Sequence, residues 1–418
     1  MTILDSEPSS SLGDLRSHLQ SKGYALHSIE HLCSNAGKFL SYIEERRIAL
    51  EAVQPANVAM FMRRQLQDHR RRHGRMPTNR KGWRTWCTDG VVQLLRFTHQ
   101  QWPPARRARN PGEALAQSLC TEYRRWLTEC RGLSASTIEG YLEEIQRFLT
   151  WYLRQGGRQE RLELTVRHID QYLQFRAGVI RRTTLKLVSL RLSGFLRFLH
   201  RVGRLSDDLS RSMIHPTLYE FENIPSVLRP AEITQILKVT RQDRCPRGRR
   251  DLAILMLLAM YGLRAGEIVR LALDDIDWRA ETIVIRHSKV RSTTVLPLLP
   301  AVGEALLGYL RSGRPKTTAR EVFIRMSAPL QGFSQKSVLH ALVSRRIAAA
   351  GVRPVGKHGP HVFRHAHAVA LLRAAVPMKT ISDLLGHRTS RSTAIYLKLD
   401  SEELRAVALP LPVVGGAS

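Results

Sequence analysis

Cysteine is scarce in this sequence. The chain has five cysteines among 418 residues: Cys33, Cys87, Cys120, Cys130 and Cys245. Their odd number and scattered positions provide no disulfide framework and none of the close spacing of a zinc site. We therefore expect a protein of a reducing compartment, with no bound metal and no other cofactor.

Long hydrophobic runs and a secretion signal are missing as well. The longest apolar run, Leu252–Tyr261, is too short to cross a bilayer and is typical of a buried helix. The N-terminal residues MTILDSEPSSS lack the basic start and the apolar stretch of a signal peptide. We expect a soluble, cytoplasmic protein that does not enter a membrane.

Carboxylates are few relative to cations. The sequence has 36 Asp and Glu against 65 Lys and Arg, a formal net charge of +29. Such a charge destabilises a compact fold by self-repulsion unless an anionic partner neutralises it. Nucleic acid fits this requirement, and an anionic membrane surface is the alternative that the charge alone leaves open. Because 43% of the residues are apolar, we expect folded domains rather than a disordered chain.

The chain divides into three segments, residues 1–110, 111–215 and 225–418. A basic linker near residues 102–109 closes the first segment, and Ile224-Pro225-Ser226 opens the third. Apolar residues recur at helical spacing through the first two segments, which we predict to be all-helical.

The first two segments also resemble each other. An alignment pairs residues 23–30 with 132–139, Phe39-Leu40 with Phe148-Leu149 and, after a two-residue insertion, Val58 and Phe61 with Ile169 and Tyr172. A repeated helical unit accounts for these pairs. Chance similarity between amphipathic helices is the alternative.

The third segment combines helices with a hairpin. Two runs rich in β-branched residues, Glu281–Arg286 and Ser292–Leu298, predict paired strands. Helices are expected over residues 230–237, 251–263, 301–310, 335–350, 362–375 and 378–385. The sequence therefore predicts a mainly α, multidomain protein whose third domain is mixed α/β, mostly helical, with a small antiparallel sheet.

Six polar residues of the third segment stand in short, distinctive contexts. They occur in Gly-Leu-Arg-x-x-Glu, in the hairpin turn, in His-x-x-Arg-His, in Leu-Gly-His and in Ala-Ile-Tyr: Arg264, Lys289, His361, Arg364, His387 and Tyr396. Each short pattern is weak by itself, whereas all of them in this order are a strong combined signal.

This ordered set resembles the tyrosine recombinases, or phage integrases, a family that includes lambda integrase, Cre and the Xer recombinases. The resemblance covers a catalytic domain at residues 225–405 and a helical core-binding domain, of the SAM-like type, at 111–215. It implies a site-specific recombinase or integrase that acts on double-stranded DNA as a tetramer, alone or with sister recombinases. The added residues 1–110 resemble those of members borne on transposons or plasmids.

The residue chemistry agrees with strand cleavage and rejoining. Arg264 and Arg364 would hold the non-bridging oxygens of an attacked phosphate. The Tyr396 hydroxyl would be the nucleophile, with His361 as its acid/base partner. The other two side chains would act on the phosphate and the leaving group: His387 as a hydrogen-bond donor and Lys289 as the acid that protonates the departing 5′-oxygen. The 3′-phosphotyrosine would conserve the bond energy, so the reaction would need neither ATP nor metal.

Other interpretations remain open at this point. Arg264 could cap a helix C-terminus, Lys289 could be an ordinary turn lysine, and His361 with His365 could bind a metal. The same chemistry serves a type IB topoisomerase-like nicking and closing enzyme, and a catalytically silent DNA-binding protein could keep the fold. The sequence departs from the family pattern at Val362, where Asp is frequent, and after Tyr396, where a histidine two places on is frequent.

Two features have no assigned chemistry. Glu267 either orients Arg264 or a neighbouring backbone group, or is a simple surface acid. A short helix is expected at Ser401–Ala408, and the tail, residues 402–418, is expected to dock on a neighbouring subunit.

Overall fold

The computed structural model describes residues 8–99, 101–104, 108–156, 162–218, 226–287, 292–334, 337–354, 356 and 358–386. The chain forms two compact units, one of Pro103–Asn223 and one that joins Met1–Trp102 with Ile224–Ser418. The boundary at Trp102 falls within the basic linker expected from the sequence. The predicted separation of 1–110 from 225–418 stays a proposal, which two distinct apolar cores, one in each segment, support.

The N-terminal segment is helical throughout its described part. It consists of α1 (Pro8–Ser21), α2 (Leu26–Glu44), η1 (Leu50–Ala52), α3 (Pro55–His73) and α4 (Arg80–Thr98). Its core gathers apolar side chains of α2 and α4, such as Ile29, Phe39, Val91 and Leu94, around Phe61 of α3. Gly90 lies where α2 and α4 approach most closely, since an added Cβ would sit 2.0 Å from the carbonyl oxygen of Leu32.

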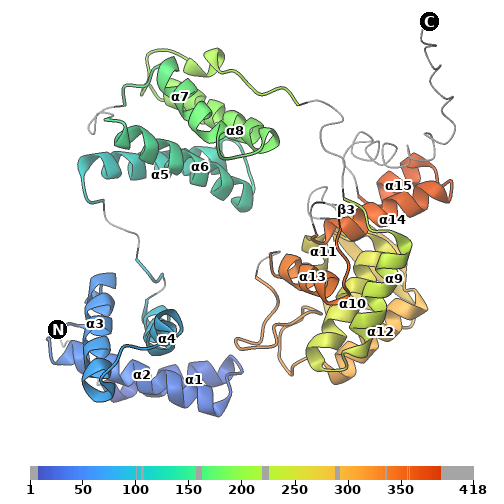
Figure 1. Ribbon diagram of the computed structural model, residues 1–418, viewed down its shortest axis with the longest axis horizontal. Helices are drawn as coiled ribbons and strands as arrows, with labels where there is room; N and C mark the ends of the chain where they lie inside the picture. Colours follow the sequence, from blue (N-terminus) through green and yellow to red (C-terminus); the bar gives the residue numbers. More distant parts are fainter. Residues whose placement is uncertain are drawn as a thin grey trace, which may run out of the picture. The chain divides into compact units, whose positions relative to one another are not determined.

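The unit at Pro103–Asn223 is a second helical bundle, drawn in green in Figure 1. It contains α5 (Pro111–Glu129), α6 (Ala135–Arg154), α7 (Val166–Ala177), α8 (Arg182–Arg201) and η2 (Leu209–Ser212). Helix α5 begins at a proline that needs no hydrogen-bond acceptor, after Asn110, whose side chain accepts from the Glu113 N–H at 2.8 Å. Phe148, Phe195 and Leu199 lie in its core.

The C-terminal segment is the mixed α/β part. Its helices are α9 (Pro230–Gln242), α10 (Pro246–Tyr261), α11 (Ala265–Arg270), η3 (Leu273–Asp275), α12 (Pro300–Ser312), α13 (Ser337–Ala349), α14 (His361–Arg373) and α15 (Met378–Leu384). Helix α10 carries the longest apolar run and lies in the centre of this segment, packed by α9, α12 and α14 (Figure 1). Leu255, Leu257 and Leu258 are all fully buried, as the run predicts.

One antiparallel sheet completes this segment. Its order is β1 (Ile276–Asp277), β2 (Thr282–His287) and β3 (Ser292–Pro297), with Ile283 opposite Leu296 and His287 opposite Ser292. The predicted hairpin and the mainly helical, multidomain architecture are confirmed; strand β1 was not anticipated, because two residues are too few to show alternation. Successive inward positions of β2 are Ile283, Ile285 and His287.

Candidate active site

The turn that carries Arg264 is held in place by packing. Helix α10 ends because Gly262 takes a left-handed conformation, with φ of +60°, and α11 starts at once after Arg264. A Cβ on Gly262 would lie 3.0 Å from Cδ2 of His367 and 3.1 Å from Cδ2 of Leu385. The turn therefore packs against α14 and the end of α15, and position 262 has little room for a side chain.

Arg264 is tied to two separate parts of the chain. Its backbone N–H and its Nη1 donate to Glu267, at 2.7 and 3.0 Å, and its Nη2 donates to the carbonyl of Gly386 at 2.7 Å. Arg264 is the N-cap residue of α11, and the guanidinium bonds described above lead to Glu267 and Gly386 rather than to the end of α10. Its side chain keeps 18% of its surface exposed, so Arg264 is not fully enclosed by the protein.

Glu267 is the buried anion that holds this arrangement. The residue is 5% exposed, and its Oε1 also lies 2.8 Å from Nδ1 of His287. Burial alone would raise the pKa of Glu267, but hydrogen bonds from His287 and from Arg264 outweigh it and lower the pKa to about 2. The alternative of a surface acid is therefore wrong, and the expected orienting contact to Arg264 is present.

His287 was missed by the sequence reasoning. It ends β2, is 3% exposed, and its Nε2 lies 3.0 Å from Oγ1 of Thr294 on β3. The alternation of the strand contained the signal, since Ile283, Ile285 and His287 occupy every second position. A buried histidine that joins two strands to Glu267 stabilises the end of the hairpin next to its turn.

Arg364 is anchored on the same two short segments as Arg264. It is 3% exposed on α14, donates from Nη1 to the carbonyl of Gly262 at 2.9 Å, and donates from Nη2 to the carbonyl of Leu385. Leu385 and Gly386 are consecutive, and Gly262 is two residues from Arg264. The structure thus holds both guanidiniums on the same two short segments, where planar donors could act together on one anion.

The histidines of α14 complete the described part of the site. His361 opens the helix, and its ring lies 6.1 Å from that of His365, one turn further on. Burial first, then the electrostatic effects of the neighbouring His361 and Arg364, lower the pKa of His365 to about 4. The His365 imidazole is therefore neutral near pH 7.

Three expected site residues fall outside the described residues: Lys289, His387 and Tyr396. The expected helix Ser401–Ala408 and the tail 402–418 also lie there. By sequence, Lys289 belongs to the four residues that join β2 to β3, and His387 directly follows Gly386, the acceptor for Arg264. Of the six expected residues, Arg264 and Arg364 are thus anchored on the same two segments, and His361 lies on α14 together with Arg364.

Within the described ranges, no group of three or more His, Cys, Asp or Glu side chains could hold a metal ion. The same part of the chain contains no helix that is both long and apolar enough to cross a membrane.

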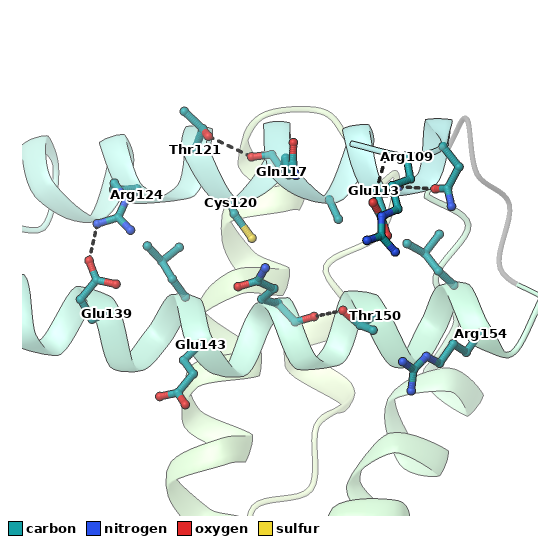
Figure 2. A pocket seen from close by; sticks show the side chains of 15 residues that line it. Arg109, Glu113, Gln117, Cys120, Thr121, Arg124, Glu139, Glu143, Thr150 and Arg154 are labelled. Carbon is teal, nitrogen blue, oxygen red and sulfur yellow. Dashed lines mark hydrogen bonds and ion pairs between the residues drawn. The ribbon is translucent and has the colours of Figure 1, made fainter. Parts of the chain in front are cut away.

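A groove of about 1100 Å³ lies elsewhere, between α5 and α6 (Figure 2). Its charges are balanced, since Arg109, Arg124 and Arg154 face it together with Glu113, Glu139 and Glu143. Arg124 is already paired with Glu139 at 2.6 Å. The groove lacks the excess of cations that a phosphate clamp requires.

The known sequences that resemble this chain are integrases and recombinases. Residues 226–403 match the model of the phage integrase family. The chain is 31% identical over 398 residues to the putative integrase/recombinase y4rA of Sinorhizobium fredii, covering 94% of this chain and 92% of that protein. It is also 56% identical over 189 residues to the putative integrase/recombinase y4gC of the same organism, covering 45% of this chain and 97% of that protein.

A solved structure shows the same fold. The XerH site-specific recombinase bound to its difH substrate, in a pre-cleavage complex, aligns with a TM-score of 0.55 at 19% identity. The alignment covers 73% of this chain and 99% of that one.

Proposed function

Because the chain belongs to the phage integrase family, the tyrosine recombinases, we propose that it cleaves and rejoins DNA strands at specific sites through a covalent bond to Tyr396. The observation that carries the proposal is the pair of guanidiniums, Arg264 and Arg364, fixed on the adjacent carbonyls of Gly386 and Leu385. The net charge of +29 supports duplex DNA as the substrate.

The proposed cleavage step is one phosphoryl transfer. The Tyr396 oxygen attacks the phosphorus of a phosphodiester, a new bond forms between them, and the bond from phosphorus to the 5′-oxygen breaks. His361 accepts the tyrosine proton, and Lys289 gives a proton to the departing 5′-oxygen. The product is a 3′-phosphotyrosine and a free 5′-hydroxyl.

The other residues act on the charge that develops. Negative charge grows on the non-bridging oxygens, and fixed cationic donors stabilise it without reorganisation. Arg264 and Arg364 would supply those donors, and His387 would add a hydrogen bond. Rejoining is the reverse step with a new 5′-hydroxyl, and it consumes neither ATP nor metal because the phosphotyrosyl bond conserves the energy.

The proposed assembly is a tetramer on paired DNA sites, formed by this chain alone or with sister recombinases, and it rests on the family resemblance. Exchange of strands between two duplexes would distinguish this function from topoisomerase-like nicking and closing of one duplex. A chain that binds DNA but forms no adduct would be the silent DNA-binding protein.

The test is a nicked suicide substrate, built on the recombination junction found by sequencing the DNA that flanks the gene. The nick lets the 5′ fragment diffuse away and traps the covalent adduct. We expect an adduct with the wild-type chain, none with Tyr396→Phe, and unchanged DNA affinity, because the substitution removes one oxygen. Tyr141→Phe, in the other unit, serves as the matched control and should form adduct normally. An adduct that persists in Tyr396→Phe would contradict the assignment and point to Ser392 or Thr393.

The acid is tested separately from the nucleophile. Lys289→Ala should cleave poorly, and a 5′-bridging phosphorothiolate should restore cleavage because a thiolate departs without a proton. The same substrate should not rescue Tyr396→Phe. A Lys289→Ala defect that the phosphorothiolate leaves unchanged would assign the acid to another residue.

A further inference from the structure

The N-terminal segment and the unit at Pro103–Asn223 have the same internal plan. In each, four helices follow in order, the first packs on the second, and the second packs on the fourth. In each, a glycine of left-handed conformation, Gly23 or Gly132, precedes the second helix, with φ of +77° or +54°. The helices that follow these glycines have nearly equal lengths, 19 residues in α2 and 20 in α6.

The two cores also contain the same aromatic pair. Phe39 of α2 lies edge-on to Phe61 of α3, with centroids 5.2 Å apart and an angle of 78°. Phe148 of α6 lies edge-on to Tyr172 of α7, at 5.0 Å and 71°. These residues are the ones that the sequence alignment pairs, and all four are buried. The matching core contact favours a repeated unit over chance similarity between amphipathic helices.

The N-terminal segment carries a dense cationic surface, which we name the basic turn, residues 70–84. It covers the last turn of α3, the connection, and the first turns of α4, and contains no carboxylate. Its seven cations are all exposed: Arg70, Arg71, Arg72, Arg75, Arg80, Lys81 and Arg84.

The two ends of the basic turn lie side by side. The rings of His69 on α3 and Trp83 on α4 are 5.5 Å apart. Desolvation first, then the neighbouring His73, Arg72 and Arg75, lower the pKa of His69, so both arginines lie near this ring. The junction of α7 and α8 at the same place in the other unit is also basic, with Arg181, Arg182 and Lys186 and no acidic residue.

Among the described residues, the cations of the basic turn have no carboxylate partner. Within the described ranges, no Asp or Glu forms an ion pair with any of the seven, whereas Arg64 on the same helix α3 pairs with Glu45 at 2.5 Å. Like charges gathered on one surface repel, and an external polyanion relieves that repulsion. Arginine forks in an exposed turn suit the oxygens of a phosphate backbone.

We propose that residues 8–99 are a second copy of the four-helix unit and that the basic turn binds the phosphate backbone of duplex DNA. The proposal rests on the proposed function, since it assigns a further contact to the same substrate. The contact positions the protein along the duplex and reads no sequence, because phosphates are the same at every base pair.

The test compares two triple variants of the full chain that lose equal charge. One is Arg72→Gln with Arg75→Gln and Arg84→Gln, in the basic turn. The control is Arg16→Gln with Lys38→Gln and Arg96→Gln, exposed cations of the same unit outside the turn. Binding to a duplex is measured over a series of salt concentrations.

Each lost phosphate contact should reduce the magnitude of the slope of log affinity against log salt by about 0.9. For the three substitutions of the basic-turn variant, the slope should therefore decrease in magnitude by about 2 to 3. The control should retain the wild-type slope. Equal slopes for both variants, or equal losses, would overturn the proposal, because bulk charge alone would then explain binding. A loss confined to phosphatidylserine vesicles, with DNA binding intact, would also overturn it and indicate a lipid surface.

Failure of the DNA-contact proposal can be distinguished from failure of the proposed cleavage mechanism. The salt slope is measured on DNA binding alone and requires no cleavage by Tyr396. A wild-type chain that forms no adduct would refute the cleavage mechanism and leave the salt-slope comparison valid.

Discussion

Glu267 and His287 form a buried pair, with Oε1 of the carboxylate 2.8 Å from Nδ1 of the ring, and the same oxygen accepts from Nη1 of Arg264 at 3.0 Å. One carboxylate therefore joins the hairpin to the arginine that we assign to the phosphate. The hairpin is also the segment whose connection contains Lys289. Glu267 and His287 are thus positioning residues in our assignment.

Replacing Glu267 by glutamine should weaken this link. The amide keeps the shape but removes the charge, so the hydrogen bonds from Arg264 and His287 lose their ionic character. We expect the free energy of unfolding to fall by about 2–3 kcal/mol. Adduct formation should also slow, with DNA affinity little changed. Glu139→Gln is the control: its exposed pair with Arg124 should contribute less than about 1 kcal/mol. If the two variants lowered the free energy of unfolding equally in denaturant, the buried contacts of Glu267 would stabilise the fold no more than the exposed pair of Glu139 does.

A double-mutant cycle should reveal the coupling between the pair. Glu267→Gln and His287→Asn each disrupt the same contact, so the second change should cost less once the first is present. We expect a coupling of about 1 kcal/mol or more in unfolding free energy, whereas Glu139→Gln with His287→Asn should be additive. Additivity within the Glu267 cycle would mean that the two side chains act independently.

Gly386 should tolerate no side chain. Its φ is +58°, and an added Cβ would lie 2.8 Å from Nδ1 of His287, next to the carbonyl that receives Arg264. Gly386→Ala should therefore reduce adduct formation strongly, in addition to the cost of about 1 kcal/mol for the left-handed backbone. Gly351→Ala is the matched control, since its φ is +70° but nothing lies within 4 Å. It should pay the backbone cost and cleave normally; a similar cleavage loss in both would reject the steric explanation.

Stability should depend on pH through His365. Burial, with the neighbouring His361 and Arg364, lowers the pKa of His365 from 6.5 to about 4, so the folded chain binds a proton here less readily than the unfolded chain does. The free energy of unfolding should therefore fall as pH drops from about 6.5 to about 4, by up to about 1.4 kcal/mol per pH unit. Burial of His367, aided by Arg364, lowers its pKa too and adds to the same slope.

His365→Gln should flatten this slope in denaturant unfolding measured across the window. His73→Gln, at an exposed position, should leave it unchanged. The contribution of Glu267 is separate, because its lowered pKa, about 2, matters only as pH falls below about 4.5. An unchanged slope in His365→Gln would show that the pH dependence of stability in this window does not come from the lowered pKa of His365.

Local patterns predicted most of the secondary structure of the site, but not α11, the six-residue helix that carries Glu267, which is too short to show helical periodicity. The apolar run predicted a buried α10, and the two β-branched runs predicted the β2–β3 hairpin. The helix that carries His361 and Arg364 was expected one residue later than it begins. Its expected end, residue 375, lies two residues beyond Arg373, because the chain turns at Ala374–Ala375, where Ala375 has a positive φ.

The sequence by itself determined the ordered set of polar residues, the excess of positive charge and the faces of the helices, because each depends on composition or on spacing within one element. Only the tertiary structure decided that Arg264 reaches the carbonyl of Gly386 and that Arg364 reaches that of Gly262. These contacts join positions more than a hundred residues apart, and helical or strand periodicity carries no information about such a distance. The burial of Glu267 was undecided for the same reason: a carboxylate can be enclosed only where distant donors, here His287 with the nearby Arg264, satisfy it.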